Sequence, residues 1–336
     1  MASLRLSSVR DLTIDIGGMP ILVHTDSPEF AHMLEDRYGE FINAHVRRAA
    51  MELEIRLVEE LGLGKDGEDD LSVRQDGGRW IMERGDFRAE WDTQSHRGWA
   101  RLRPNRYAID GVLRILHSLI LAGEGGFLVH AASAVRHGRA FVFAGISGAG
   151  KTTISRLAPP DVTLLTDEIS YLRETGHRTR DTGGVAGTAM RGFEDRGESE
   201  ESPIADSKFN ITNLKLQIPN HQSRITHNQS PIPHPVSRIP AFSAFGTPFA
   251  GELARIGQKV RAPLAALFLL KQGPENRIEP LSEGQAAREL LRHVLFFAHD
   301  QELVEMVFHT VCDLVRRVPV RRLVFTPDAR VWELIA

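Results

Sequence analysis

The sequence predicts an α/β protein of about two domains, in which a glycine-rich loop joins a buried strand to a short helix. Three observations lead to this prediction. The 336 residues correspond to two domains at roughly 150 residues each. Residues 1 to 104 mix alternating apolar patterns with one helical pattern. The string GISGAGKT at residues 145–152 stands between an apolar run and a helical run.

Composition narrows the class of protein. Hydrophobic residues make up 42% and charged residues 25% of the chain, as is usual in soluble proteins, and the net charge of -3 indicates neither nucleic-acid nor membrane binding. Cys312 is the only cysteine, which excludes an intramolecular disulfide and a site of several thiolates. The longest apolar run, residues 262–270, is far shorter than the ~20 residues needed to span a bilayer. We therefore expect a cytoplasmic protein without a nucleic-acid or membrane partner.

Residues 1–104 are expected to form an N-terminal α+β domain. Residues 12–26 alternate around Gly17-Gly18 and predict a hairpin. Ser27-Pro28 then provides an N-cap and a proline at the first helical position, so a helix is expected to follow. Several short strands are predicted between residues 71 and 102.

Residues 105–336 are expected to form the second domain. A helix over 107–122 precedes two apolar strands at 127–135 and 139–145, and a short helix follows at 151–158. One buried strand is predicted over 162–172, another over 263–271, two helices within 282–316, and a last strand over 321–327. Residues 174–243 hold six of the 17 prolines and only two leucines, which predicts a polar, disordered insertion.

The string at residues 145–152 fits the phosphate-binding pattern G-x-x-x-x-G-K-[ST] of P-loop proteins. Its glycines permit a backbone whose N–H groups surround a phosphate, and the helix that follows points its positive end at the same place. Lys151 is then expected to reach the β- and γ-phosphates of ATP, and the Thr152 hydroxyl to bind Mg²⁺. The expected nucleotide-binding residues are Gly145, Ser147, Gly148, Ala149, Gly150, Lys151, Thr152 and Thr153.

Asp167 and Glu168 end the apolar part of the next predicted strand. Two adjacent carboxylates at such a position are costly unless a cation or donor pairs with them, although a solvated strand end is the simpler alternative. The string LSEGQ at 281–285 resembles a signature of ABC ATPases, but it follows the acidic pair instead of preceding it, so Ser282 is interpreted as a helix N-cap. The NKxD motif of GTPases is absent from the sequence.

Residues 127–172 resemble the catalytic domain of HPr kinase/phosphorylase and related proteins. The family has a histidine before the P-loop strand, a GxSGxGK[ST] loop, a short helix and a strand that ends in an acidic pair. His130, residues 145–152 and Asp167-Glu168 occur here in that order. The resemblance is strong over about fifty residues and weaker over 100–336. It implies the P-loop core shared with ATP-dependent phosphoenolpyruvate carboxykinase.

The resemblance implies an ATP-dependent kinase that transfers the γ-phosphoryl group to a hydroxyl, such as a serine of a peptide or protein, or to a small alcohol. Asp167 would be the base, Glu168 and Thr152 would hold Mg²⁺, and His130 would orient the acidic pair or touch phosphate; the reverse assignment of the two carboxylates stays open. The pair is Asp-Glu where the family has Asp-Asp, and no EIRGLG-type segment is found. A nucleotide-binding regulatory module with weak or no transfer is therefore the alternative. The acceptor, the choice of ATP or GTP and a homo-oligomeric state stay open.

Overall fold

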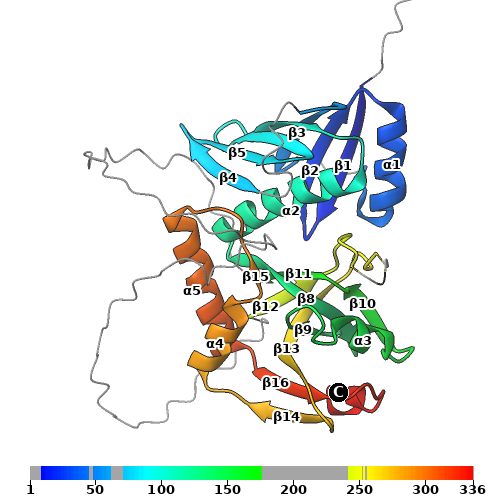
Figure 1. The fold of residues 1–336 in the computed structure, drawn as a ribbon, viewed down its shortest axis with the longest axis vertical. Coiled ribbons are helices and arrows are strands. Elements are labelled where there is room, and N and C mark those ends of the chain that lie inside the picture. Colours follow the sequence, from blue (N-terminus) through cyan, green and yellow to red (C-terminus); the bar gives the residue numbers. More distant parts are fainter. Residues whose placement is uncertain are drawn as a thin grey trace, which may run out of the picture.

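The computed structural model describes residues 9–44, 48–61, 71–175, 241–251, 253 and 256–335. The insertion predicted at 174–243 lies outside the described residues, apart from its ends at 174–175 and 241–243. Two sheets with helices between and beside them make up the described part (Figure 1). None of the described helices is long and apolar enough to span a membrane.

The first sheet contains seven strands in the order β1-β2-β3-β7-β6-β5-β4. The predicted hairpin and the predicted N-cap at Ser27 are both confirmed: β1 pairs with β2 across Gly17-Gly18, and the Ser27 hydroxyl accepts the N–H of Phe30. One helix, α1, and a 3-10 turn at Gly39–Phe41 follow the hairpin. The strands and the helix are β1 (Arg10–Ile16), β2 (Met19–Thr25), α1 (Pro28–Tyr38), β3 (Met51–Leu57), β4 (Ser72–Asp76), β5 (Arg79–Arg84), β6 (Phe87–Asp92) and β7 (Arg97–Leu102).

Helix α2 (Arg106–Gly123) lies between the two sheets (Figure 1). The Asn105 side chain caps it by accepting the N–H groups of Tyr107 and Ala108. Thirteen of its eighteen residues are buried, because the helix packs on α1, β6 and β7 on one side and on β8 on the other. One continuous cluster of buried hydrophobic residues therefore spans both sheets, and the boundary at residue 104/105 stays a prediction.

The second sheet is mixed. Its main path runs β10-β8-β11-β12-β13-β16-β14, and β9 and β15 also pair with β8. The strands are β8 (Gly126–Arg136), β9 (Arg139–Ala144), β10 (Val162–Thr166), β11 (Ile169–Glu174), β12 (Phe242–Phe245), β13 (Arg261–Gln272), β14 (Arg277–Pro280), β15 (Val294–Leu295) and β16 (Val320–Phe325). The helices are α3 (Lys151–Arg156), α4 (Glu283–Leu291), α5 (Gln301–Arg317) and α6 (Val331–Ile335). Ser282 caps α4 in a capping box, as expected.

Five strands of this sheet close a ring, because β8 pairs with β11, β11 with β12, β12 with β13, β13 with β9, and β9 again with β8. Within the ring the β9–β13 pair is parallel and the other pairs are antiparallel. Outside it, β13 also pairs with β16, in parallel. Neither the ring nor the mixed pairing decides for or against the expected P-loop core of the HPr kinase type. That assignment stays a prediction.

The prediction of one uninterrupted strand over 162–172 is wrong. β10 ends at Thr166 and β11 starts at Ile169. The register against β8 is the same on both sides of the break, since Thr166 opposes Ser133 and Ile169 opposes His130. The chain bends between them because the Thr166 hydroxyl accepts the N–H groups of residues 168 and 169, each at 3.2 Å. Asp167 and Glu168 occupy this bend.

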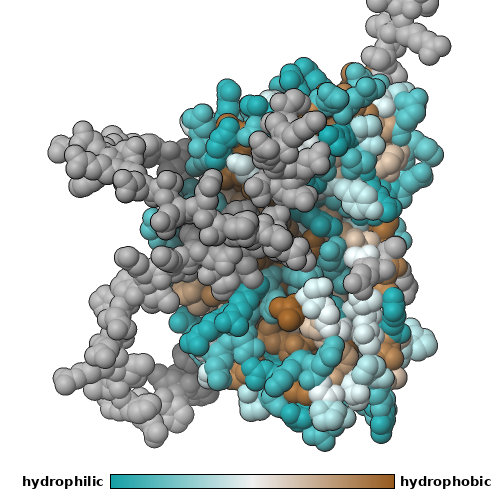
Figure 2. Space-filling model, in the orientation of Figure 1, coloured by the Kyte–Doolittle hydropathy of each residue, from teal (hydrophilic) through white to brown (hydrophobic). Residues whose placement is uncertain are grey.

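The two halves of the described part differ on the face shown in Figure 2. On this face, hydrophilic side chains predominate around the first sheet, whereas apolar side chains are visible in the lower half, where the second sheet lies.

A second, smaller cluster of buried apolar residues joins the second sheet to α3 and α6. Trp332 in α6 donates its ring N–H to the carbonyl of Ile154 in α3, at 3.1 Å, which fixes α3 against the C-terminal end of the described chain.

Candidate active site

Strand β8 brings the two sequence motifs together. Along one edge of β8, β9 pairs up to Ala144, and the chain leaves the sheet at Gly145, where the P-loop motif begins. Along the other edge, the bend at Asp167-Glu168 interrupts the line of β10 and β11. Ala131 of β8 opposes Ala144 on one side and donates its N–H to the Glu168 carbonyl on the other, at 2.9 Å. With strands ~4.8 Å apart, the acidic pair and the start of the loop are about 10 Å apart.

Three glycines of the loop, at positions 145, 148 and 150, have different reasons to be glycine. Gly150 has φ +108, and a Cβ there would lie 2.4 Å from Cζ of Phe325 in β16. At Gly145 the backbone is ordinary, but a Cβ would lie 2.6 Å from that of Ala149. Gly148 also has a positive φ, +77, in open space. The conformation that the motif predicts therefore depends on positive φ angles and close packing.

Lys151 begins α3 and folds back over the loop. Its ammonium donates to the carbonyls of Gly145 at 2.9 Å and Ile146 at 3.0 Å, and the residue is 8% exposed. Thr152 and Thr153 are half-buried in the first turn of α3, whereas Ser147 is exposed and Ala149 is buried. The predicted nucleotide-binding residues thus form one continuous loop and helix start, with the ammonium held in the loop.

Asp167 is buried and held by backbone donors. One carboxylate oxygen accepts the N–H of Gly251 at 2.8 Å and the other that of Leu253 at 2.9 Å. The residue is 4% exposed. Each carboxylate oxygen can accept two hydrogen bonds, so each retains capacity for one more.

Glu168 points to helix α2. Its carboxylate accepts a hydrogen bond from the guanidinium of Arg114 at 3.2 Å. The Arg114 guanidinium also lies over the ring of Phe249, 5.1 Å from its centre, and its buried Nε has no hydrogen-bond partner among the described residues. The two side chains are 25% and 30% exposed, so the ion pair is partly shielded from water. Arg114 is a site residue that no sequence signal indicates, since it lies in an ordinary amphipathic helix.

The segment after β12 covers the acidic pair, and sequence reasoning assigned it no role. The Thr247 hydroxyl donates a hydrogen bond to the carbonyl of Ile169, and the Thr166 hydroxyl donates one to the carbonyl of Phe249. Gly251 passes so close that a Cβ there would lie 2.9 Å from that of Glu168. The glycines and other small residues of AFGTPFAG could have indicated this contact, because a close approach of two backbone segments favours small residues.

Two histidines lie where the loop leaves the sheet. His130 donates its N–H to the carbonyl of His293 at 2.7 Å, in the gap between β9 and β15 along β8. Burial, together with the positive charges of Lys151 and Arg292, lowers the pKa of His293 to about 4. The sequence resemblance indicates His130 but contains nothing that points to His293.

The described residues contain no cluster of three or more His, Cys, Asp or Glu side chains suited to a metal ion. Mg²⁺ does not require such a cluster in a nucleotide site, because it is held by one or two protein oxygens together with phosphate oxygens and water. The Thr152 hydroxyl and the Glu168 carboxylate are oxygen donors of this kind.

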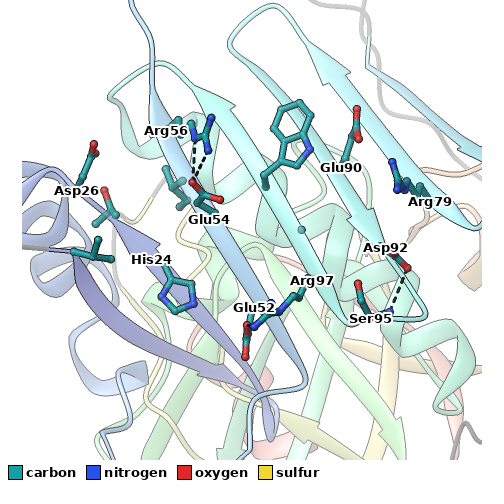
Figure 3. A pocket seen from close by; sticks show the side chains of 15 residues that line it. His24, Asp26, Glu52, Glu54, Arg56, Arg79, Glu90, Asp92, Ser95 and Arg97 are labelled. Carbon is teal, nitrogen blue, oxygen red and sulfur yellow. Dashed lines mark hydrogen bonds and ion pairs between the residues drawn. The ribbon is translucent and has the colours of Figure 1, made fainter.

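A hollow of about 800 Å³ lies elsewhere, on the outer face of the first sheet (Figure 3). Its charged lining side chains include two ion pairs between neighbours, Arg97 with Glu52 and Arg56 with Glu54. The acidic pair and the P-loop do not line it. We interpret this hollow as a solvated sheet face with one ion pair between strands and one within β3.

Models of known protein families show no match to this sequence, and the search of curated proteins likewise finds no match. The resemblance to HPr kinases consequently rests on the sequence motifs.

Proposed function

We propose that this protein is an ATP-dependent kinase of the HPr-kinase-like type, which transfers the γ-phosphoryl group to a hydroxyl of a peptide, protein or small alcohol. The observation that carries the proposal is that strand pairing is interrupted on both edges of β8. On one edge the phosphate-binding motif begins where β9 ends, and on the other edge the bend with the two carboxylates separates β10 from β11, about 10 Å away across one strand. Phosphoryl transfer depends mainly on such positioning and on charge neutralisation.

In this proposal Lys151 and the loop N–H groups bind the nucleotide phosphates. Thr152 and Glu168 would hold Mg²⁺, which neutralises charge that develops on the phosphate oxygens. Asp167 accepts the proton of the acceptor hydroxyl. Its two backbone N–H bonds fix its orientation, and each oxygen retains a lone pair for that proton.

One observation favours the alternative of a nucleotide-binding regulatory module. Both carboxylates already have protein partners: Asp167 has two backbone N–H groups, and Glu168 has Arg114. A protein that only binds a nucleotide does not need either carboxylate to leave its protein partner in order to take up a proton or a metal ion. The two functions differ in whether label from ATP reaches any acceptor in a lysate of the host.

The first test removes the loop ammonium. Lys151→Met keeps the aliphatic stem, and we expect it to weaken ATP binding at least 100-fold, about 2.7 kcal/mol. Arg277→Met is the matched control, since Arg277 is an exposed cation that pairs with Glu275 and Glu279. Unchanged ATP affinity in the Lys151 variant, measured by calorimetry on folded protein, would contradict the proposal.

The second test separates transfer from binding. Asp167→Asn should retain ATP, because the loop and Lys151 are intact, but should lose transfer by a factor of roughly 10² to 10⁴. Asp161→Asn is the control, as Asp161 is an exposed acid just before β10 that pairs with Arg136. A wild-type protein that binds ATP but labels nothing supports the regulatory module. Full transfer by the Asp167 variant, together with lost transfer in Glu168→Gln, would reverse the two carboxylate roles.

A further inference from the structure

The side chains of His130 and His293 lie on the same face of the second sheet. Residues opposite each other in an antiparallel pair project to one side. Val294 opposes Val129, so His293 opposes His130, and their backbone hydrogen bond agrees with this register. Strand alternation places His130 on the same face as Ala132 and Ala134.

That face is the one covered by the P-loop helix. Ala132 and Ala134 belong to the buried cluster that includes Ile154 of α3, whereas Val129 and Ala131, on the other face of β8, belong to the larger cluster, which also contains Leu128 near the start of the strand. Both imidazoles therefore project to the side on which α3 and its loop lie.

His293 also stands at the place where the loop begins. β9 occupies the edge of β8 as far as Ala144, which opposes Ala131, and β15 takes over at Val294, which opposes Val129. His293 fills the single position between them, beside Gly145. The carbonyl of Gly145 holds the Lys151 ammonium at 2.9 Å. A phosphate that replaces this carbonyl as the partner of Lys151 would come next to His293.

The charge state of His293 suits a hydrogen-bond donor. With a pKa of about 4, caused first by burial and then by Lys151 and Arg292, the ring is neutral near pH 7. A neutral imidazole carries one N–H and can donate it to an anionic oxygen. The charged groups that act on its pKa, Lys151 from α3 and Arg292 from its own segment, are both cations, so the site attracts an anion.

We propose that His293 contacts the nucleotide directly, by donating a hydrogen bond to an oxygen of the terminal phosphate of a bound nucleoside triphosphate. This inference rests on the proposed function, since it needs a nucleotide in the loop. It adds a residue from a distant part of the chain to the phosphate site and predicts that this residue distinguishes a triphosphate from a diphosphate.

The test compares Mg²⁺-ATP with Mg²⁺-ADP in calorimetric titrations of wild type and His293→Leu. The expected result is at least a 10-fold loss of ATP affinity with ADP affinity unchanged within 2-fold. His293→Gln carries an amide N–H near the position of the ring Nε2, and it should recover part of the ATP affinity. His32→Leu is the control, because His32 is 74% exposed on α1.

The outcomes separate this inference from the proposed function. Equal losses for ATP and ADP, or no loss for either, would overturn the role of His293 and leave the kinase proposal standing. A wild type that binds neither nucleotide would overturn both. If His293→Leu does not fold, the Gln variant decides: it must bind ATP more weakly than wild type and ADP equally well, and any other result overturns the contact.

Discussion

His117 provides a quantitative prediction about stability and pH. It lies in α2, between the two sheets, with its ring edge-on to Tyr171 at 5.8 Å between ring centres. The residue is fully buried, and neither ring nitrogen has a hydrogen-bond partner among the described residues. Burial lowers the pKa of His117 to about 4, although the nearby charge of Asp15 acts in the opposite direction.

The sign of the effect follows from the two pKa values. Above pH 6.5 His117 is neutral in both the folded and the unfolded chain. As the pH falls from 6.5 towards 4, the unfolded chain takes up a proton that the folded chain does not, so stability is lost. A change from 6.5 to about 4 makes the free energy of unfolding about 2 kcal/mol smaller at pH 5 than at pH 7, and about 3 kcal/mol smaller below pH 4.

The perturbation is His117→Leu, which has a similar volume and does not titrate. At pH 7 we expect a change in stability of less than ~1.5 kcal/mol, since no hydrogen bond is lost. Between pH 7 and pH 5 the variant should lose about 2 kcal/mol less than wild type in urea unfolding. His32→Leu, at an exposed position of α1, should keep the wild-type dependence. If the His117 variant loses as much stability as wild type on acidification, the ring is already charged or solvated in the folded protein and the reasoning fails.

Two further predictions concern the loop and the acidic pair. Gly150→Ala places a methyl group 2.4 Å from Phe325 at φ +108 and should cost about 2–5 kcal/mol, against about 1–2 for Gly148→Ala at a similar φ in open space. Equal costs in urea unfolding would show that Phe325 does not press on the loop. Arg114→Met removes the partner of Glu168 and should cost about 1.5–3 kcal/mol and reduce transfer, with ATP affinity unchanged. Arg114→Lys should restore part of both, and loss of ATP binding in either variant would contradict the assignment.

Local patterns predicted the elements well where a residue's neighbours in sequence determine its structure. The Gly17-Gly18 hairpin, the Ser27 and Ser282 caps and helix α2 all follow from spacing over a few residues. The loop at 145–152 was equally visible, since its glycines and lysine act through their own backbone. The one strand that was predicted incorrectly, over 162–172, is divided by a side-chain hydrogen bond of Thr166, which apolar periodicity does not register.

The rest of the candidate site depends on contacts that are distant in sequence. Arg114 meets Glu168 across 54 positions, and Gly251 meets Asp167 across 84. His293 reaches the loop only because β15 continues the edge of β8 that β9 leaves. Each depends on how distant elements pack or pair with one another, and no local motif encodes that arrangement. A resemblance confined to about fifty residues could therefore indicate the loop and the acidic pair but not the groups that hold them.

The acidic pair is also connected to the first sheet through two routes. Arg114 holds Glu168 from α2, the helix that packs on β6 and β7. Lys259, which follows the segment that binds Asp167, pairs with Asp15 at the end of β1, at 3.1 Å. Since the two carboxylates have their partners on separate elements, each of which contacts the first sheet, a displacement of that sheet would move both sets of partners together. The first sheet is therefore part of what positions the proposed catalytic groups, and a variant that loosens it should lower transfer more than ATP binding.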